Sequence, residues 1–169
     1  MKNVTTTYLE MTSRAELRPA GDPRIPFTVV RVDVATPDLN RFLYVAVGDE
    51  WQWRDRLDWD RSRWLQYVSR PEFETWVAYV RGTPAGYFEL ERTAEAVEVA
   101  YFGLLPDFIG FGVGGALLTA AIERAFDSGA ARVWLHTCTL DHPQALANYL
   151  ARGMRVYRTE QADGDHGPA

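Results

Sequence analysis

The sequence has little of what marks exported or membrane-bound proteins. Cys138 is the only cysteine among 169 residues, so no internal disulfide can form, which favours a reducing compartment. The first residues, MKNVTTTYLEM, contain no apolar segment of a signal peptide. No run of the chain approaches the roughly 20 apolar residues that a membrane span requires. We therefore expect a cytoplasmic protein with no membrane partner.

An excess of positive charge is also missing. The formal net charge is −5, and without surplus cations for phosphate contacts we expect no nucleic-acid partner. Hydrophobic residues make up 47% of the chain and charged residues 24%, which is the composition of a globular protein. The length suits one domain with a sizeable core. We expect that domain over residues 1–161 and a disordered polar tail over residues 162–169.

The most informative stretch runs from residue 97 to residue 129. Residues 97–104 are mostly β-branched, aromatic or aliphatic, which predicts a strand. A glycine-rich run, Gly110 to Gly115, follows. Residues 117–126 then repeat apolar side chains at helical spacing, and Gly129 suits the cap of that helix. A glycine loop that opens a helix exposes unpaired N–H groups and a partial positive charge, which together favour binding of a phosphate group.

Three interpretations of this loop follow from the residues alone. A Walker loop is excluded, because Gly115 is followed by Ala116 and Leu117 instead of Lys and Ser or Thr. The spacing Gly110-x-Gly112-x-x-Gly115 satisfies the dinucleotide fingerprint, but the next predicted strand, residues 132–137, ends without the acid that binds the ribose. A plain tight turn with close helix–strand packing remains open.

Three segments resemble the GNAT superfamily of acetyl-CoA-dependent N-acyltransferases. Residues 109–114, IGFGVG, resemble the family's pyrophosphate loop. Two positions depart from its pattern: Ile109 stands where the family prefers Gln or Arg, and Phe111 stands where a basic residue is common. Residues 98–104, EVAYFGL, resemble its fourth strand. Residues 142–154, with Ala145, Tyr149 and Gly153 at the family's spacing, resemble its last helix. The resemblance covers residues 75–157.

The order of elements predicts a mixed α+β fold. We expect a short edge strand at residues 8–11, strands at 27–34, 75–81, 85–91, 96–105, 133–137 and 154–159, and helices after Thr36, after Asp60 or Ser62, through residues 117–126 and over 143–152. The same order predicts a mostly antiparallel sheet with helices on both faces. The resemblance implies a V-shaped opening between strands 96–105 and 133–137, which acetyl-CoA would enter.

The resemblance also implies residue roles for transfer of an acetyl group. Glu98 matches the family's general base, with Glu89, Glu91 and Glu95 as competing carboxylates, and Tyr149 matches the general acid above the thioester sulfur. A backbone N–H near Leu104 is the expected oxyanion donor, since a bulge in a strand frees amides. The expected pyrophosphate contacts are the backbone amides of the loop, at Phe111, Gly112, Val113, Gly114 and Gly115.

The stretch from Asp49 to Asp60 is rich in acids and tryptophans. Acids attract cations and tryptophan faces bind them, so Trp51, Trp53 and Asp55 are candidates to bind a cationic amine acceptor, either a small molecule or a peptide. A structural role for these residues remains open. His136, Cys138, Asp141 and His142 match no zinc pattern, and we expect no metal.

Three functions are compatible with these patterns. The first is an N-acetyltransferase that moves an acetyl group from acetyl-CoA to a primary amine by direct attack in a ternary complex. The second is a catalytically silent acyl-CoA-binding sensor on the same fold, and the third is a nucleotide-dependent oxidoreductase. Since many members of the resembled family dimerise, a homodimer is also expected.

Overall fold

A single seven-stranded sheet organises the protein. The computed structural model describes residues 3–162, and the strands lie in the order β2-β3-β4-β5-β6-β1-β7. Their bounds are β1 (Val4–Met11), β2 (Thr28–Arg31), β3 (Phe73–Val80), β4 (Thr83–Arg92), β5 (Ala96–Leu104), β6 (Arg132–Cys138) and β7 (Arg155–Ala162). All neighbouring strands pair antiparallel except β5 and β6, which pair parallel. The predicted mostly antiparallel α+β fold is therefore confirmed.

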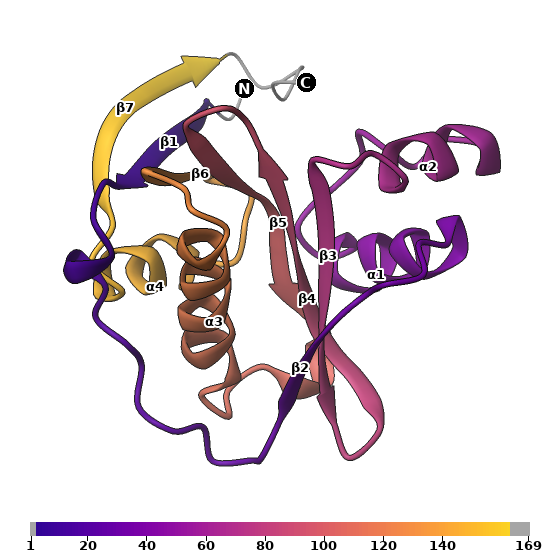
Figure 1. The fold of residues 1–169 in the computed structure, drawn as a ribbon, viewed down its shortest axis with the longest axis horizontal. Coiled ribbons are helices and arrows are strands. Elements are labelled where there is room, and N and C mark those ends of the chain that lie inside the picture. The colour runs from indigo at the N-terminus through magenta and orange to yellow at the C-terminus, as the bar shows by residue number, and fades with distance from the viewer. Residues whose placement is uncertain (1–2, 163–169) are drawn as a thin grey trace.

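Helices cover both faces of the sheet, as expected. Figure 1 shows α1 (Pro37–Gly48) and α2 (Arg61–Val68) on one side, and α3 (Val113–Asp127) and α4 (Ala145–Ala151) on the other. The cap predicted at Thr36 is present, and Asp60, one of the two candidates for the second helix, caps α2. The Thr36 hydroxyl accepts from the Leu39 amide, and the Asp60 carboxylate accepts from the Arg63 amide. Among residues 3–162, no helix combines the length and apolar character needed to cross a bilayer.

The N-terminal strand is the main departure from the expected elements. The sequence predicted a short edge strand at residues 8–11, but β1 runs from Val4 to Met11 and lies between β6 and β7. Leu9 and Met11 are completely buried in the core beneath α3. The prediction was wrong because alternation over four residues shows that a strand forms but not which strands flank it.

The observed bounds of several strands and helices also differ from the predicted ones. The strand predicted at residues 27–34 is shortened to Thr28–Arg31, and the helix predicted over 143–152 begins at Ala145. The last strand extends to Ala162 and pairs there with Val4. Residues 163–169 of the expected tail lie outside the described residues.

An apolar layer covers each face of the sheet. On the α3 side, Val97 and Val99 of β5 pack in one core cluster with Val133 and Leu135 of β6 and the apolar side of α3. On the opposite side, α1 and α2 cover a layer that is mostly aromatic, with Tyr44, Trp64 and Tyr87 completely buried. Because side chains alternate along a strand, Glu98 on β5 and His136 on β6 point to the α1 and α2 side.

Candidate active site

The site begins where β5 and β6 part. The two strands pair only at Ala96 with Arg132, Val97 with Val133 and Glu98 with Trp134, although β5 continues to Leu104 and β6 to Cys138. The expected opening between these strands is therefore present. It starts directly after Glu98.

Backbone amides of β5 face this opening. The Leu105 amide donates to the Ala85 carbonyl on β4 at 2.8 Å. Since successive amides of a strand point to opposite sides, the amides of Leu104 and Phe102 point away from β4, toward the side that β6 has left. The bulge that we expected near Leu104 lies instead at Ala100, where the register with β4 shifts. The parting of the strands, and not a bulge, leaves these donors without a neighbouring strand.

The glycine loop leads from β5 into α3. Gly112 is the N-cap of α3 at a φ of 82°, a conformation that favours glycine, and no side chain caps the helix. The first helical residues, Val113, Gly114 and Gly115, therefore present amides with no intrahelical partner, and no acidic residue lies in the first turn. These features fit a phosphate group of an acyl-CoA donor.

Tyr149 lies on α4, on the same side of the sheet as the glycine loop. It is 6% exposed, and its ring meets the Phe102 ring of β5 edge-on at a centroid distance of 6.3 Å. Burial, with a smaller effect from the Asp141 carboxylate, raises the pKa of the hydroxyl well above its ordinary value. The hydroxyl therefore stays protonated at neutral pH, as a proton donor must.

Glu98 lies on the other side of the sheet. Its carboxylate is partly buried, and Oε1 is 3.6 Å from Nδ1 of His136 across the parting strands. The competing carboxylates are less suited to act as a base. Glu89 is completely buried in an ion pair with Arg56, and Glu91 accepts from Arg70 at 2.6 Å. Glu95 is exposed in the turn before β5.

Arg56 occupies a buried aromatic cage that the sequence did not reveal. Its guanidinium lies over five rings, those of Tyr44, Trp59, Trp64, Tyr67 and Tyr101, at 4.1–5.7 Å from their centroids. Burial is the largest single effect and disfavours the charged guanidinium, but the Glu89 carboxylate together with the nearby tyrosine hydroxyls raises the pKa of Arg56. Trp59 therefore packs around a cation of the chain itself.

Trp53 lies beside the opening on the Glu98 side, and Asp55 follows it two residues later. Trp53 packs on Tyr101 at a centroid distance of 4.9 Å, and its Nε1 donates to Asp141 at 3.4 Å. A Cβ atom at Gly103 of β5 would lie 3.7 Å from the Trp53 ring. Asp55 is exposed, and its carboxylate contributes, after burial and Asp141, to the raised pKa of the Cys138 thiol.

Trp51 contacts a different part of the site. Its ring meets the His142 ring edge-on at 4.8 Å. Together with the Trp53–Asp141 hydrogen bond, this contact ties the segment after α1 to the loop between β6 and α4. The two tryptophans thus connect both sides of the opening.

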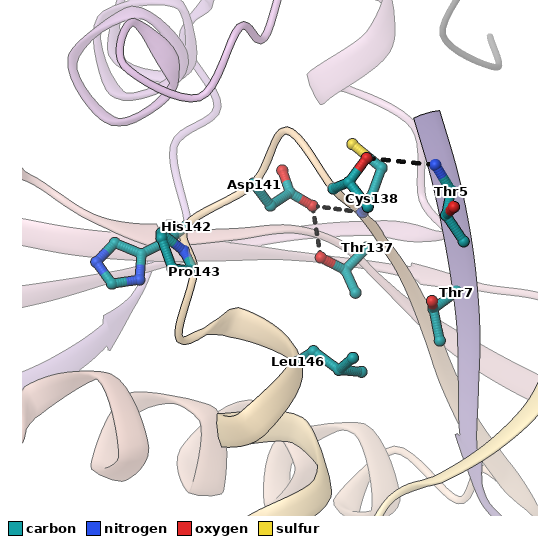
Figure 2. Close-up of a pocket in the computed structure, with 9 residues that line it drawn as sticks. Thr5, Thr7, Thr137, Cys138, Asp141, His142, Pro143 and Leu146 are labelled. Atoms are coloured by element: carbon teal, nitrogen blue, oxygen red, sulfur yellow. Dashed lines mark hydrogen bonds between the residues drawn. The ribbon is translucent and has the colours of Figure 1, made fainter. Parts of the chain in front are cut away.

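A pocket of about 250 Å³ lies beside that loop, on the α4 side of β1 and β6. Figure 2 shows the Asp141 carboxylate directed at Thr137 and Cys138, and it accepts from the Thr137 hydroxyl at 2.6 Å and from the Cys138 amide at 2.9 Å. Among residues 3–162, no group of three or more His, Cys, Asp and Glu side chains is placed to hold a metal ion.

Solved structures with this fold include three informative examples. A GCN5-related N-acetyltransferase from Sphaerobacter thermophilus has a TM-score of 0.65 and 20% identity, covering 92% of this chain and 49% of its own. The ribosomal-protein-S18-alanine N-acetyltransferase from Escherichia coli has 0.59 and 16%, covering 76% and 77%. An aminoglycoside acetyltransferase from an uncultured soil sample has 0.60 and 16%, covering 75% and 86%.

This chain spans between 49% and 63% of the length of four of the matched solved chains, and no curated protein matches its sequence. The family assignment rests on the sequence model described as "Acetyltransferase (GNAT) family", which matches residues 37–154. This match covers more than half of the chain and includes β5, the glycine loop, α3 and α4. The chain belongs to the acetyltransferase (GNAT) family of enzymes.

Proposed function

We propose that the protein transfers an acetyl group from acetyl-CoA to a primary amine by direct attack in a ternary complex. The observation that carries the proposal is the position of Tyr149 and Glu98 on opposite sides of the sheet, at the opening between β5 and β6. The donor would enter from the side of α3 and α4. The amine would approach from the side of α1 and α2.

Each step of this reaction has a candidate group. A free alkylamine has a pKa of about 10, so it must lose a proton before attack, and Glu98 is the proposed base, directly or through a water. The amides of Phe102 and Leu104 face the opening and suit a developing oxyanion. Tyr149 would protonate the departing thiolate. The uncapped first turn of α3 would bind the diphosphate of acetyl-CoA through the amides of residues 111–115.

An amine panel tests this proposal. The protein is incubated with acetyl-CoA and with polyamines, aminated small molecules and peptide amines, and release of free thiol is measured together with the mass of the acetylated product. At least one amine should be acetylated, and Glu98→Gln should remove the acid limb of the pH–rate profile, whereas Glu95→Gln should retain it. Binding of acetyl-CoA without turnover of any amine would favour the acyl-CoA sensor.

The proposed acceptor is a cationic amine with some apolar surface. Asp55 is exposed two residues after Trp53, and the Trp53 ring covers Gly103 of the strand that carries the proposed oxyanion donors. One solved structure with this fold is named an aminoglycoside acetyltransferase and another a ribosomal-protein-S18-alanine N-acetyltransferase, so both small molecules and peptides belong in the amine panel. The position of Trp51 against His142 suits a role at the edge of this acceptor site.

Kinetics with the best amine tests the acceptor assignment. Asp55→Asn and Trp53→Phe should raise KM for the amine several-fold and leave the affinity for acetyl-CoA unchanged, and the wild-type KM should rise with salt. Asp58→Asn, which removes an exposed acid from the same loop, is the matched control. A KM that changes with neither substitution nor with ionic strength would place the acceptor elsewhere.

The expected homodimer remains a proposal, which light scattering on the purified protein tests.

A further inference from the structure

The glycine loop carries no basic side chain of its own. Residues 105–117, which include the loop and the first turn of α3, contain no Lys, Arg or His. Backbone amides alone would then face two phosphate groups. Two arginines from elsewhere in the chain nevertheless lie against this loop.

Arg24 comes from the segment between β1 and β2. Figure 1 shows this segment passing beneath the N-terminal end of α3. The Arg24 amide donates to the Phe111 carbonyl at 2.8 Å. Its guanidinium donates to the Gly110 carbonyl and lies over the Phe111 ring, 5.8 Å from the ring centroid. The same segment is also held before Arg24, where the Ala20 amide donates to the Thr119 hydroxyl at 3.0 Å. Arg24 is exposed, so its other N–H groups remain open to a ligand.

Arg152 follows α4 and reaches the same helix end from the other direction. A Cβ atom on Gly115 would lie 2.5 Å from Nη1 of Arg152, so the guanidinium lies directly against the first turn of α3. Nη1 is 3.5 Å from the Asn148 side-chain oxygen, and Nε is buried with no hydrogen-bond partner among the described residues. A buried guanidinium N–H without a partner is costly unless a ligand or water satisfies it.

The N-terminus of α3 and the two arginines that lie against it carry positive charge. The helix N-terminus carries a partial positive charge, so nearby cations are unfavourable there unless an anion joins them. Neither Arg24 nor Arg152 has a carboxylate within 4.0 Å among residues 3–162. A planar guanidinium binds phosphate oxygens in a bidentate manner, which makes a phosphate-bearing ligand the fitting counter-charge.

We infer that Arg24 and Arg152 bind the diphosphate of the acyl-CoA donor and replace the basic side chains that the loop lacks. The inference rests on the proposed function, because it takes acyl-CoA as the donor. Arg24 lies before residue 37, outside the part of the chain that matches the family model. Glycine supplies the close approach of the backbone, and these two arginines supply the charge.

Calorimetry with three donors tests the inference. Acetyl-CoA, its 3′-dephospho form and acetyl-pantetheine, which has no phosphate, are titrated into the wild type, Arg24→Gln and Arg152→Gln. Each substitution should weaken both phosphate-bearing donors about tenfold and leave acetyl-pantetheine unchanged. Arg41→Gln, which removes an exposed arginine from α1 on the opposite face, should leave all three affinities unchanged.

Several outcomes would overturn the inference. An equal loss with acetyl-pantetheine would mean that the arginines only support the fold, and a loss with acetyl-CoA but not with its dephospho form would assign them to the 3′-phosphate. Unchanged affinity for every donor would also contradict it. If a Gln variant is unfolded, Arg24→Lys, which keeps the charge, should retain part of the phosphate-dependent affinity, and full loss would count against the inference. Failure of the wild type to bind any donor would instead reject the proposed function.

Discussion

At the scale of single residues, the two candidate catalytic side chains differ in their surroundings. Tyr149 is almost completely buried beside Phe102, whereas Glu98 is partly exposed and faces His136 across the parting strands. A buried hydroxyl that stays protonated suits an acid, and a carboxylate open to solvent suits a base that acts through water. Family resemblance pointed to both residues from sequence, but their separation onto two faces of the sheet required the structure.

Removing the Tyr149 hydroxyl tests its role. Tyr149→Phe should lower kcat on the order of 100-fold and change the affinity for acetyl-CoA little. Burial raises the pKa of Tyr149 above 10.0. Deprotonation of Tyr149 should therefore not lower the wild-type rate between about pH 7 and 9. Tyr157→Phe, which removes an exposed hydroxyl from β7, is the control. A Tyr149→Phe variant with wild-type kcat would assign the proton to another donor.

At the scale of elements, local signals predicted helices well and long-range contacts poorly. Thr36 was identifiable as a helix cap, and the second cap was narrowed to Asp60 or Ser62, because a cap is set within four residues. The ion pair of Arg56 with Glu89 joins residues 33 positions apart, and nothing in the acidic, tryptophan-rich loop distinguishes Arg56 from its neighbours. The structure therefore changes the interpretation of this loop, since part of its aromatic surface binds Arg56.

The Arg56–Glu89 pair should anchor the loop between α1 and α2. Arg56→Met leaves the Glu89 carboxylate buried without its partner, and breaking a buried pair in this way costs about 3–5 kcal/mol. Arg56→Met/Glu89→Gln should recover part of that loss, because no unpaired charge remains. Arg63→Met, an exposed arginine 4.5 Å over the Trp59 ring, should cost no more than about 1 kcal/mol. Urea unfolding measures all three, and a loss below about 1 kcal/mol for Arg56→Met would contradict the anchoring role.

At the scale of the whole molecule, β1 joins β6 and β7, the two other strands that lie beyond the opening. It pairs with β6 on one side and β7 on the other, and no other described strand contacts β7. Glu10 of β1 accepts from Arg132 of β6 at 2.6 Å and from Arg155 of β7 at 3.4 Å. The position of β1 was beyond sequence analysis, because it depends on which distant strands leave an edge free.

The ion pairs of Glu10 should make stability depend on pH. The hydrogen bond from Arg132, with Coulomb attraction from both arginines, lowers the pKa of Glu10 below its ordinary value of 4.5. A carboxylate whose pKa is lower in the folded state stabilises the fold above about pH 4.5 and loses that contribution as the pH falls through the folded pKa. Glu10→Gln should cost about 1–2 kcal/mol at pH 7, and the difference from wild type should shrink toward pH 3. A cost that is the same at both pH values would contradict this role of the charge.

The most direct measurement is titration of acetyl-CoA into the wild type, Gly114→Ala and Gly114→Glu. A Cβ at Gly114 would make only ordinary contacts, with the nearest atom 3.7 Å away on Leu104, so the alanine variant should fold and still bind. The glutamate variant adds a negative charge at the first turn of α3, where the diphosphate is proposed to bind. We predict measurable binding for the wild type and Gly114→Ala and none for a folded Gly114→Glu. Wild-type affinity in folded Gly114→Glu would contradict the assignment of this loop to acetyl-CoA.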